Sequence, residues 1–184
     1  MLRIPHLIAI CGYPGSGKTE VQNILAEIDV LPVDDGAPVR DFAMRHLGLT
    51  RDQTHTQEGK AENSDIAGVY WNNRTILGEL ANRLEEMFGP HIMPYMATRT
   101  LFECNSYSFG SVRRDQGWFY KSQGGIVIGV RRPGVGPSGN EFDEFDFESV
   151  DFWIDNDGTV EDLRFKIEII LQGIQELSTI KWAA

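Results

Sequence analysis

The sequence has few cysteines and no long apolar run, and each shortage excludes a class of protein. Cys11 and Cys104 stand far apart and form no C-x-x-C pair, so a disulfide-stapled fold is not expected and a reducing compartment is favoured. No apolar run approaches the roughly 20 residues that cross a bilayer, and the opening residues lack the apolar core of a signal peptide. We therefore expect a cytoplasmic protein with no membrane partner.

Positive charge is also scarce. The chain carries 17 Lys and Arg residues against 27 Asp and Glu residues, for a net charge of −10. Binding to a nucleic acid backbone depends on basic side chains that release counterions, so no nucleic acid partner is expected. The histidines show no zinc-ligand spacing and are expected to be structural or surface residues. A small anionic ligand stays compatible with this charge, because a local cluster of amides, basic side chains and Mg²⁺ overcomes a negative overall field.

The length and the apolar pattern predict one α/β domain over residues 1–184. Apolar runs that alternate with helical patterns predict a parallel five-stranded sheet with helices on both faces, which is a three-layer fold. The predicted strands are 7–11, 30–33, 105–109, 126–130 and 151–154. The predicted helices are 20–28, 38–47, 73–88, 91–102, 115–122 and 159–177. Residues 50–65 are polar without clear periodicity and are predicted to be a mobile loop.

One glycine-rich stretch is the most informative part of the chain. Its sequence is Gly12, Tyr13, Pro14, Gly15, Ser16, Gly17, Lys18, Thr19. It matches G-x-x-x-x-G-K-T between a predicted strand and a predicted helix, where curled N–H groups and the helix start form a nest for phosphates. Lys18 would then reach the β- and γ-phosphates of a nucleoside triphosphate, and the Thr19 hydroxyl would ligate Mg²⁺. The alternative is a glycine-rich turn with an exposed lysine.

Further short motifs follow this loop in order along the chain. They are Trp71-Asn72-Asn73-Arg74, Val112-Arg113, Gly124-Gly125, Arg132-Pro133-Gly134 and Asn156-Asp157-Gly158-Thr159. Together with the loop, the ordered set resembles the bacteriophage deoxynucleoside monophosphate kinases, a branch of the P-loop kinases, over most of the chain. Among these motifs, only the loop is specific when it is taken by itself. The resemblance implies a P-loop kinase-like fold with a lid, which uses ATP and Mg²⁺ to phosphorylate a (deoxy)nucleoside monophosphate.

The resemblance assigns residues to the two sides of such a reaction. It implies a lid at about residues 131–149 and an acceptor-site region at about residues 34–75. Arg74 and Arg113 are candidates for the acceptor phosphate and the transition state, since a planar guanidinium binds phosphate bidentately. Arg132 opens the lid and would stack on adenine or neutralise the transferring group. Lys18, Arg113 and Arg132 are thus the catalytic candidates, and for Arg74 and Arg113 the alternative is a surface salt bridge.

Other candidates carry weaker signals. Asn156 lies where similar kinases approach the adenine edge, although an Asn-Asp-Gly turn has its own conformational reasons for that residue. Asp35, after the second predicted strand, would contact the substrate or metal-bound water, or else cap a helix. Arg131, next to Arg132, is a weaker candidate because one of two adjacent side chains at a strand end usually faces solvent. Tyr70 and Trp71 would line a base pocket, but core packing is the favoured interpretation.

One position departs from the family pattern and keeps alternatives open. Ser111 stands where an Asp that helps to hold Mg²⁺ is usual, so Asp34, Asp35 or Asp115 would have to compensate. A second hypothesis is a kinase of a hydroxyl acceptor, such as dephospho-coenzyme A or a sugar acid, with Asp34 or Asp35 as the base. A third is a nucleotide-binding module without catalysis. Homodimerisation is left open.

An acidic and aromatic run falls inside the expected lid. Its sequence is Glu141, Phe142, Asp143, Glu144, Phe145, Asp146, Phe147, Glu148. We interpret it as a solvated lid segment whose phenylalanines tuck against the body of the protein when the lid is closed. The alternative is a partner-binding surface, because adjacent exposed aromatic side chains mark interfaces.

Overall fold

The computed structural model describes residues 6–137, 139 and 144–180. The chain divides into two compact units, the first formed by Met1–Asp34 with Leu101–Ala184 and the second by Asp35–Thr100. Each unit has a hydrophobic core of its own.

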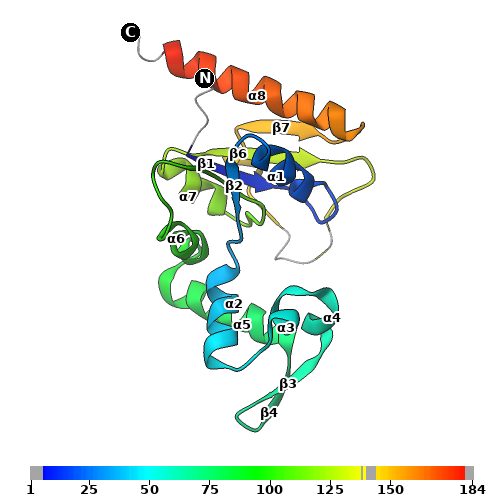
Figure 1. Ribbon diagram of the computed structural model, residues 1–184, viewed down its shortest axis with the longest axis vertical. Coiled ribbons are helices and arrows are strands. Elements are labelled where there is room, and N and C mark those ends of the chain that lie inside the picture. Colours follow the sequence, from blue (N-terminus) through cyan, green and yellow to red (C-terminus); the bar gives the residue numbers. More distant parts are fainter. Residues whose placement is uncertain (1–5, 138, 140–143, 181–184) are drawn as a thin grey trace. The chain divides into compact units, whose positions relative to one another are not determined.

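A five-stranded parallel sheet forms the centre of the first unit (Figure 1). Its strands are β1 (Leu7–Cys11), β2 (Val30–Val33), β5 (Ser106–Phe109), β6 (Ile126–Arg131) and β7 (Phe152–Asp155), in the spatial order β2-β5-β1-β6-β7. The central strand β1 is buried along its whole length between β5 and β6. An uninterrupted apolar run suits this place, because both faces of a parallel sheet are covered. The predicted strands and their parallel direction are confirmed.

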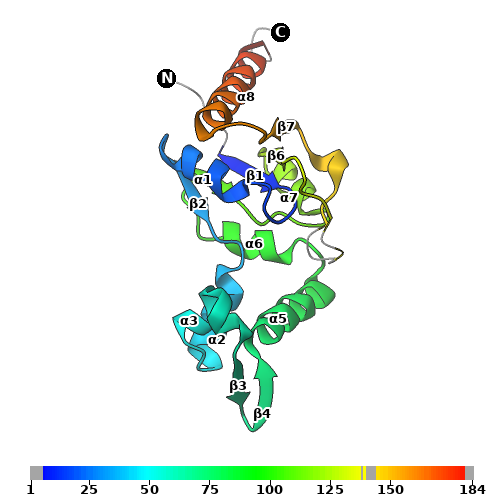
Figure 2. The same ribbon diagram turned by 90° about the vertical axis from the view of Figure 1, so that its right-hand side faces the viewer.

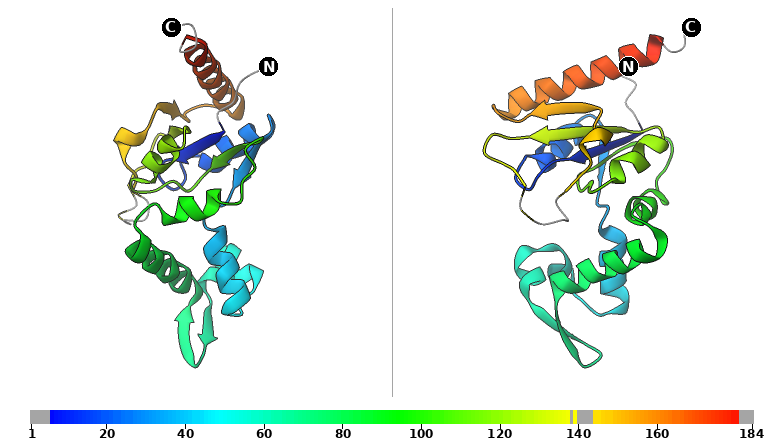
Figure 3. Two further views of the ribbon diagram at one scale, coloured as in Figure 1. Left: turned by 90° about the vertical axis from the view of Figure 1, so that its left-hand side faces the viewer. Right: turned by 180° about the vertical axis from the view of Figure 1, so that it is seen from behind.

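Helices cover both faces of this sheet (Figure 3). α1 (Lys18–Ala26) and α8 (Val160–Ile180) lie against one face and share one core with it. α7 (Gln116–Ser122) covers the other face, where the ring of Tyr120 lies 4.6 Å from that of Phe109. The three-layer α/β architecture expected from the sequence is confirmed.

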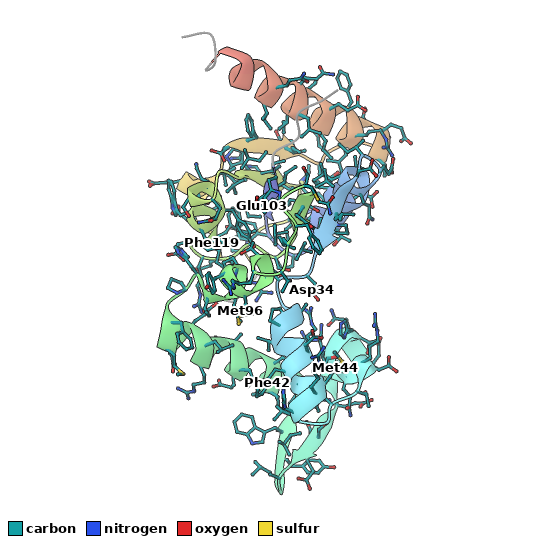
Figure 4. The ribbon with its side chains drawn as sticks, turned by 60° about the vertical axis from the view of Figure 1, so that its left-hand side comes forward. Asp34, Phe42, Met44, Met96, Glu103 and Phe119 are labelled. Carbon is teal, nitrogen blue, oxygen red and sulfur yellow. The ribbon has the colours of Figure 1, made fainter. Side chains whose placement is uncertain are left out.

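The second unit consists of helices and one hairpin (Figure 2). Its elements are α2 (Ala37–His46), α3 (Arg51–His55), α4 (Gln57–Ala61), β3 (Asn63–Ile66), β4 (Val69–Asn72), α5 (Asn73–Phe88) and α6 (Ile92–Thr98). β3 and β4 pair in antiparallel fashion. The small core of this unit contains Ala43, Leu49 and Ile76. Phe42, labelled in Figure 4, is exposed although it precedes the buried Ala43 on α2.

The prediction of a loop over residues 50–65 is wrong, because α3, α4 and β3 lie there. Capping explains how such short helices form. The backbone N–H of Gln53 donates to Oγ1 of Thr50 (3.2 Å), and Oε1 of Gln53 accepts from the N–H of Thr50 (2.9 Å). Thr56 caps α4 in a similar way through the N–H of Gly59 (2.9 Å). Five-residue helices are too short to show an apolar period, so their signal is in the caps alone.

The interpretation of Tyr70 and Trp71 as core residues is also wrong. Both lie on β4 of the hairpin, and 74% of Tyr70 and 42% of Trp71 is exposed. The hairpin turns at Ala67 and Gly68, which both have positive φ. Such a turn is usually signalled by Asn-Gly or Asp-Gly, and the Ala-Gly pair here carries no such signal.

The long helix α8 buries one stripe of side chains. Leu163, Ile167 and Leu171 are buried, whereas Val160, the first residue of the helix, is exposed. Among the described residues, no helix is both long enough and apolar enough to span a membrane.

Two matched substitutions test the orientation of α8. Ile167→Ala should lower the free energy of unfolding by about 2–5 kcal/mol, because truncation of a buried side chain leaves a cavity. Ile169→Ala should change it by less than about 0.5 kcal/mol, since Ile167 is 1% exposed and Ile169 is 51% exposed. Denaturant titration measures both values. Equal losses of stability would contradict the orientation of the helix.

Candidate functional site

Several segments of the first unit gather at one edge of its sheet. Because the strands are parallel, the segments that follow them leave from the same edge, where open α/β sheets bind their ligands. These segments include residues 12–17 after β1, 110–115 after β5, 132–137 after β6 and 156–159 after β7. The predicted site residues Arg113, Arg132 and Asn156 each lie in one of them.

The loop at residues 12–17 is curled tightly against β6. Gly12 has a φ of 145°, and a Cβ atom there would lie 2.5 Å from the carbonyl oxygen of Val130. The N–H of Ser16 donates to the carbonyl oxygen of Tyr13 (3.0 Å), which closes a turn. Gly17 then enters α1 with a left-handed φ of 104°. Glycine is needed at both positions, because a side chain would clash at Gly12 and strain the backbone at Gly17.

The loop leads directly into the positive end of a helix. α1 begins at Lys18, and the first N–H groups of a helix have no acceptor within it. The Lys18 ammonium donates to the carbonyl oxygens of Gly12 (2.6 Å) and Tyr13 (3.1 Å), so the charge is folded back over the loop. The Oγ of Ser16 is buried inside the loop without a hydrogen-bond partner. Backbone donors, an ammonium and a helix dipole thus meet where an anion would bind.

Thr19, the predicted Mg²⁺ ligand, lies exposed in the first turn of α1. Within the described part of the chain, no group of three or more His, Cys, Asp or Glu side chains is placed to hold a metal ion. The part of Thr19 as a ligand of Mg²⁺, shared with waters and with the phosphates of a bound nucleotide, stays a prediction.

Asn156 holds the loop from the side of β7. Its Nδ2 donates to the carbonyl oxygen of Ser16 (2.9 Å), and its backbone N–H donates to the carbonyl oxygen of Arg131 (2.7 Å). The residue therefore links the turn after β7 both to the loop and to the end of β6. Its expected part in reading the adenine edge stays a prediction.

A pocket of about 410 Å³ adjoins the loop. Among its lining residues are Tyr13, Arg131, Arg132, Val135, Phe145, Phe147, Trp153, Asp155 and Asp157. The aromatic rings form a continuous cluster. Ring centroids are 5.4 Å apart between Tyr13 and Phe145, 4.7 Å between Phe145 and Phe147, and 5.7 Å between Phe147 and Trp153. A largely apolar hollow with a few charged groups is typical of a small-molecule site, and stacked rings favour a flat ligand.

The two arginines at the end of β6 have different surroundings. The guanidinium carbon of Arg131 lies 3.7 Å from the ring centroid of Trp153, so Arg131 is part of the aromatic stack. Arg132 is exposed and also lines the pocket. The sequence analysis favoured Arg132 over Arg131. It could not reveal the cation–π contact of Arg131, because Trp153 lies on another strand.

The second half of the expected lid is fastened to the segment after β5. The backbone of Arg114 donates to Glu144 and accepts from Asp146, each at 2.6 Å, which forms an isolated bridge beside Phe145. Phe145 is only 8% exposed and packs against Tyr13. The expectation that the phenylalanines tuck against the body of the protein is thus met by Phe145, whereas Phe147 is 52% exposed. Residues 141–143 of the acidic run lie outside the described residues.

Arg113 and Ser111 lie in this same segment after β5. Arg113 is exposed, and its N–H donates to Oε1 of Gln116 (3.1 Å) at the start of α7. Asp115, named as a compensating ligand for Mg²⁺, immediately precedes α7 and is half-buried. The proposed roles of these residues stay predictions.

Two candidate acceptor residues belong to the second unit. Asp35 is 7% exposed and precedes α2, while Asp34, labelled in Figure 4, is the last residue of the first unit. Arg74 lies in the first turn of α5, where its Nη2 donates to Oε1 of Gln57 (2.7 Å). Because Gln57 carries no charge, this contact is a charge-assisted hydrogen bond and not the salt bridge of the alternative interpretation. A part in acceptor binding stays a prediction for both residues.

The sequence did not identify Trp153 and Tyr13 as the aromatic wall of a pocket. Trp153 pairs with Gly129 in the β6–β7 register, and a Cβ atom on Gly129 would lie 2.5 Å from the indole ring. The glycine in an otherwise β-branched strand was the only local signal that a bulky ring lies across it.

Cys11, the residue before the loop, is buried. Desolvation raises the pKa of its thiol to about 12, although the charge of Lys18 acts in the opposite direction. Its Sγ lies 3.7 Å from the carbonyl oxygen of Ile128. The thiol is therefore neutral at physiological pH and is no nucleophile.

Comparison with known proteins identifies the fold. No family model matches the sequence, and no curated protein matches it. Dephospho-CoA kinase from Campylobacter jejuni has a similar structure, with a TM-score of 0.55 and 12% identity over 94% of this chain and 98% of that chain. TT1252 from Thermus thermophilus (TM-score 0.48, 18% identity, 93% and 98% covered) and shikimate kinase from Aquifex aeolicus (0.44, 17%, 91% and 96%) are more distant in structure. The first similarity shows that the chain shares the three-layer α/β fold of that kinase.

Thiol reactivity tests the burial of the strand that carries the loop. At about pH 8, close to the ordinary thiol pKa, a thiol reagent should modify the exposed Cys104 and leave Cys11 unmodified. Because the pKa of Cys11 is raised from 9.0 to about 12, its contribution to stability is complete below about pH 9 and is lost as the pH approaches 12. In the variant Cys104→Ser, no thiol should react rapidly with the reagent. Equal rates for both cysteines would contradict the buried position of Cys11.

Proposed function

We propose that this protein is an ATP-dependent phosphotransferase that passes the γ-phosphoryl group of ATP to a small acceptor. The observation that carries the proposal is the geometry of the loop, where backbone curled at Gly12 leads into α1 beneath the Lys18 ammonium. Such a nest binds the oxygens of a polyphosphate. The similarity in fold to a dephospho-CoA kinase supports a kinase over other uses of this loop.

The donor nucleotide extends from the loop into the aromatic pocket in this proposal. Its phosphates lie on the N–H groups at the start of α1, and its base stacks among Tyr13, Trp153 and Phe147 next to Arg131. Mg²⁺, with Thr19 as its protein ligand, would neutralise charge on the β- and γ-phosphates. The ammonium of Lys18 would leave the carbonyl oxygens of Gly12 and Tyr13 to bind phosphate oxygens.

The favoured acceptor is a (deoxy)nucleoside monophosphate. A phosphate acceptor is already largely anionic near neutral pH, so its phosphorylation needs positive charge and alignment more than a base. Arg113 is exposed at the carboxyl edge of the sheet, and Arg74 begins α5. We assign Arg113 to the transition state and the acceptor phosphate, with Arg74 as a second phosphate ligand. The resemblance of the ordered motifs supports this acceptor class.

A hydroxyl acceptor is the second candidate. The solved structure of similar fold is named as a dephospho-CoA kinase, and such a reaction needs a base to take the hydroxyl proton. Asp35 follows β2 and is only 7% exposed, and its carboxylate is the candidate for that base. A module that binds nucleotide without catalysis is the third candidate, because Ser111 replaces the usual acidic residue.

An acceptor panel tests the proposed reaction. ADP release from ATP should be stimulated by at least one common nucleoside monophosphate and not by dephospho-coenzyme A or shikimate. Lys18→Ala should lower the stimulated rate by about 100-fold or more, because it removes a charge that contacts the transferring group. Arg83→Ala, which removes an exposed positive charge on α5, serves as the control and should retain the rate. If no acceptor stimulates turnover, catalysis is rejected.

Asp35→Asn separates the two acceptor classes. With a monophosphate acceptor the variant should mainly raise the KM for the acceptor, while kcat falls less than about tenfold, since no base is required. Asp41→Asn, on the exposed face of α2, is the matched control. A loss of kcat of about 100-fold or more, at the scale of a general base, would favour the hydroxyl acceptor instead.

A further inference from the structure

Asp146 lies at the centre of a group of hydrogen bonds that fixes residues 144–149. Its Oδ2 accepts from the indole Nε1 of Trp118 (2.7 Å), and its Oδ1 accepts from the backbone N–H of Glu148 (2.9 Å). Its carbonyl oxygen accepts from Oγ of Ser149 (2.7 Å), and its own N–H donates to Arg114 (2.6 Å). The indole and the amide donor hold the pKa of the Asp146 carboxyl below its ordinary value, so the carboxylate is ionised at neutral pH.

The two neighbours of Asp146 are the aromatic rings that face the pocket. Phe145 packs against Tyr13 of the loop, and Phe147 stacks on Trp153 at an interplanar angle of 27°. Trp153 in turn carries the guanidinium of Arg131. The segment therefore completes one stack of flat groups that runs from the loop to the end of β6. Phe145 lies in an isolated bridge with Arg114, and Phe147 begins the three-residue 3-10 helix η2 (Phe147–Ser149).

A short segment of this kind would be costly to order at the moment of binding. Fixing a flexible residue costs conformational entropy, and a preorganised wall removes that cost from ligand affinity. The bonds of Asp146 supply the order in advance, and they reach two separate supports, the backbone of Arg114 and the side chain of Trp118 on α7. Of these bonds, the carboxylate itself makes those from the indole of Trp118 and from the N–H of Glu148, so it ties the segment that carries the two rings to α7.

We propose that Asp146 is a positioning residue for the base of the donor nucleotide, which holds Phe145 and Phe147 as the wall of the pocket beside the loop. This inference rests on the proposed function. Asp146 itself contacts protein groups, and its effect reaches the ligand through the two rings. It therefore acts on the base and leaves the binding of the triphosphate alone unchanged.

Calorimetry with two ligands separates these effects. The full chain is titrated with ATP and with inorganic tripolyphosphate, which has no base, each in the presence of Mg²⁺. Asp146→Ala should weaken ATP binding about tenfold, the scale of one hydrogen bond to a charged group, while tripolyphosphate binds as in the wild type. Trp118→Phe, which keeps the ring and removes only the indole donor, should shift ATP binding in the same direction. Glu148→Ala removes a neighbouring charge of the same run and should leave both affinities unchanged.

The outcomes distinguish the inference from the function on which it rests. If the wild type binds neither ATP nor tripolyphosphate, the proposed function fails. If the wild type binds both, and the folded Asp146→Ala and Trp118→Phe variants bind ATP as tightly as the wild type, the inference alone is overturned. An equal loss of ATP and tripolyphosphate affinity would overturn it as well, because the effect would then belong to the loop. Circular dichroism checks that each variant is folded.

Discussion

The close approach of the loop to β6 is the constraint on which the candidate site depends. At Gly12 the backbone passes so near the carbonyl oxygen of Val130 that no side chain fits, and Asn156 holds the next turn through the carbonyl oxygen of Ser16. β1 is buried between β5 and β6, and this fixes the position at the sheet edge from which the loop begins. The helix start and the Lys18 ammonium are therefore aimed at one small volume.

The same edge of the sheet joins the loop to a pocket built from distant parts of the chain. Tyr13 belongs to the loop, Phe145 to the segment fastened to Arg114, and Trp153 to β7. Their rings contact one another in sequence, so order in one wall supports order in the next. In the proposed function the loop binds the polyphosphate of a nucleotide and the adjoining stack of rings binds its base. This pairing, more than either part alone, supports the proposal of an ATP-dependent kinase.

Local signals allowed the sheet and the loop to be predicted from sequence. The apolar run of β1 and the glycine spacing of residues 12–19 are contained in thirteen consecutive residues, 7–19. The short helices α3 and α4 were missed because Thr50 and Thr56 cap them without any apolar period. The aromatic wall was missed because Phe145 and Trp153 meet through strand register and the Arg114 bridge, which no spacing reveals. For the acceptor residues Arg74 and Arg113, the sequence offered only the resemblance and the general affinity of a guanidinium for phosphate.

A crystal structure of the full chain with Mg²⁺ and a non-hydrolysable ATP analogue tests the central claim most directly. The account predicts that the β-phosphate lies within hydrogen-bonding distance of the backbone N–H groups of residues 15–18. It also predicts that the Lys18 ammonium has left the carbonyl oxygens of Gly12 and Tyr13 for the phosphates, with the base among the rings of the pocket. A structure in which the analogue binds elsewhere, with Lys18 still on those carbonyl oxygens, would contradict it.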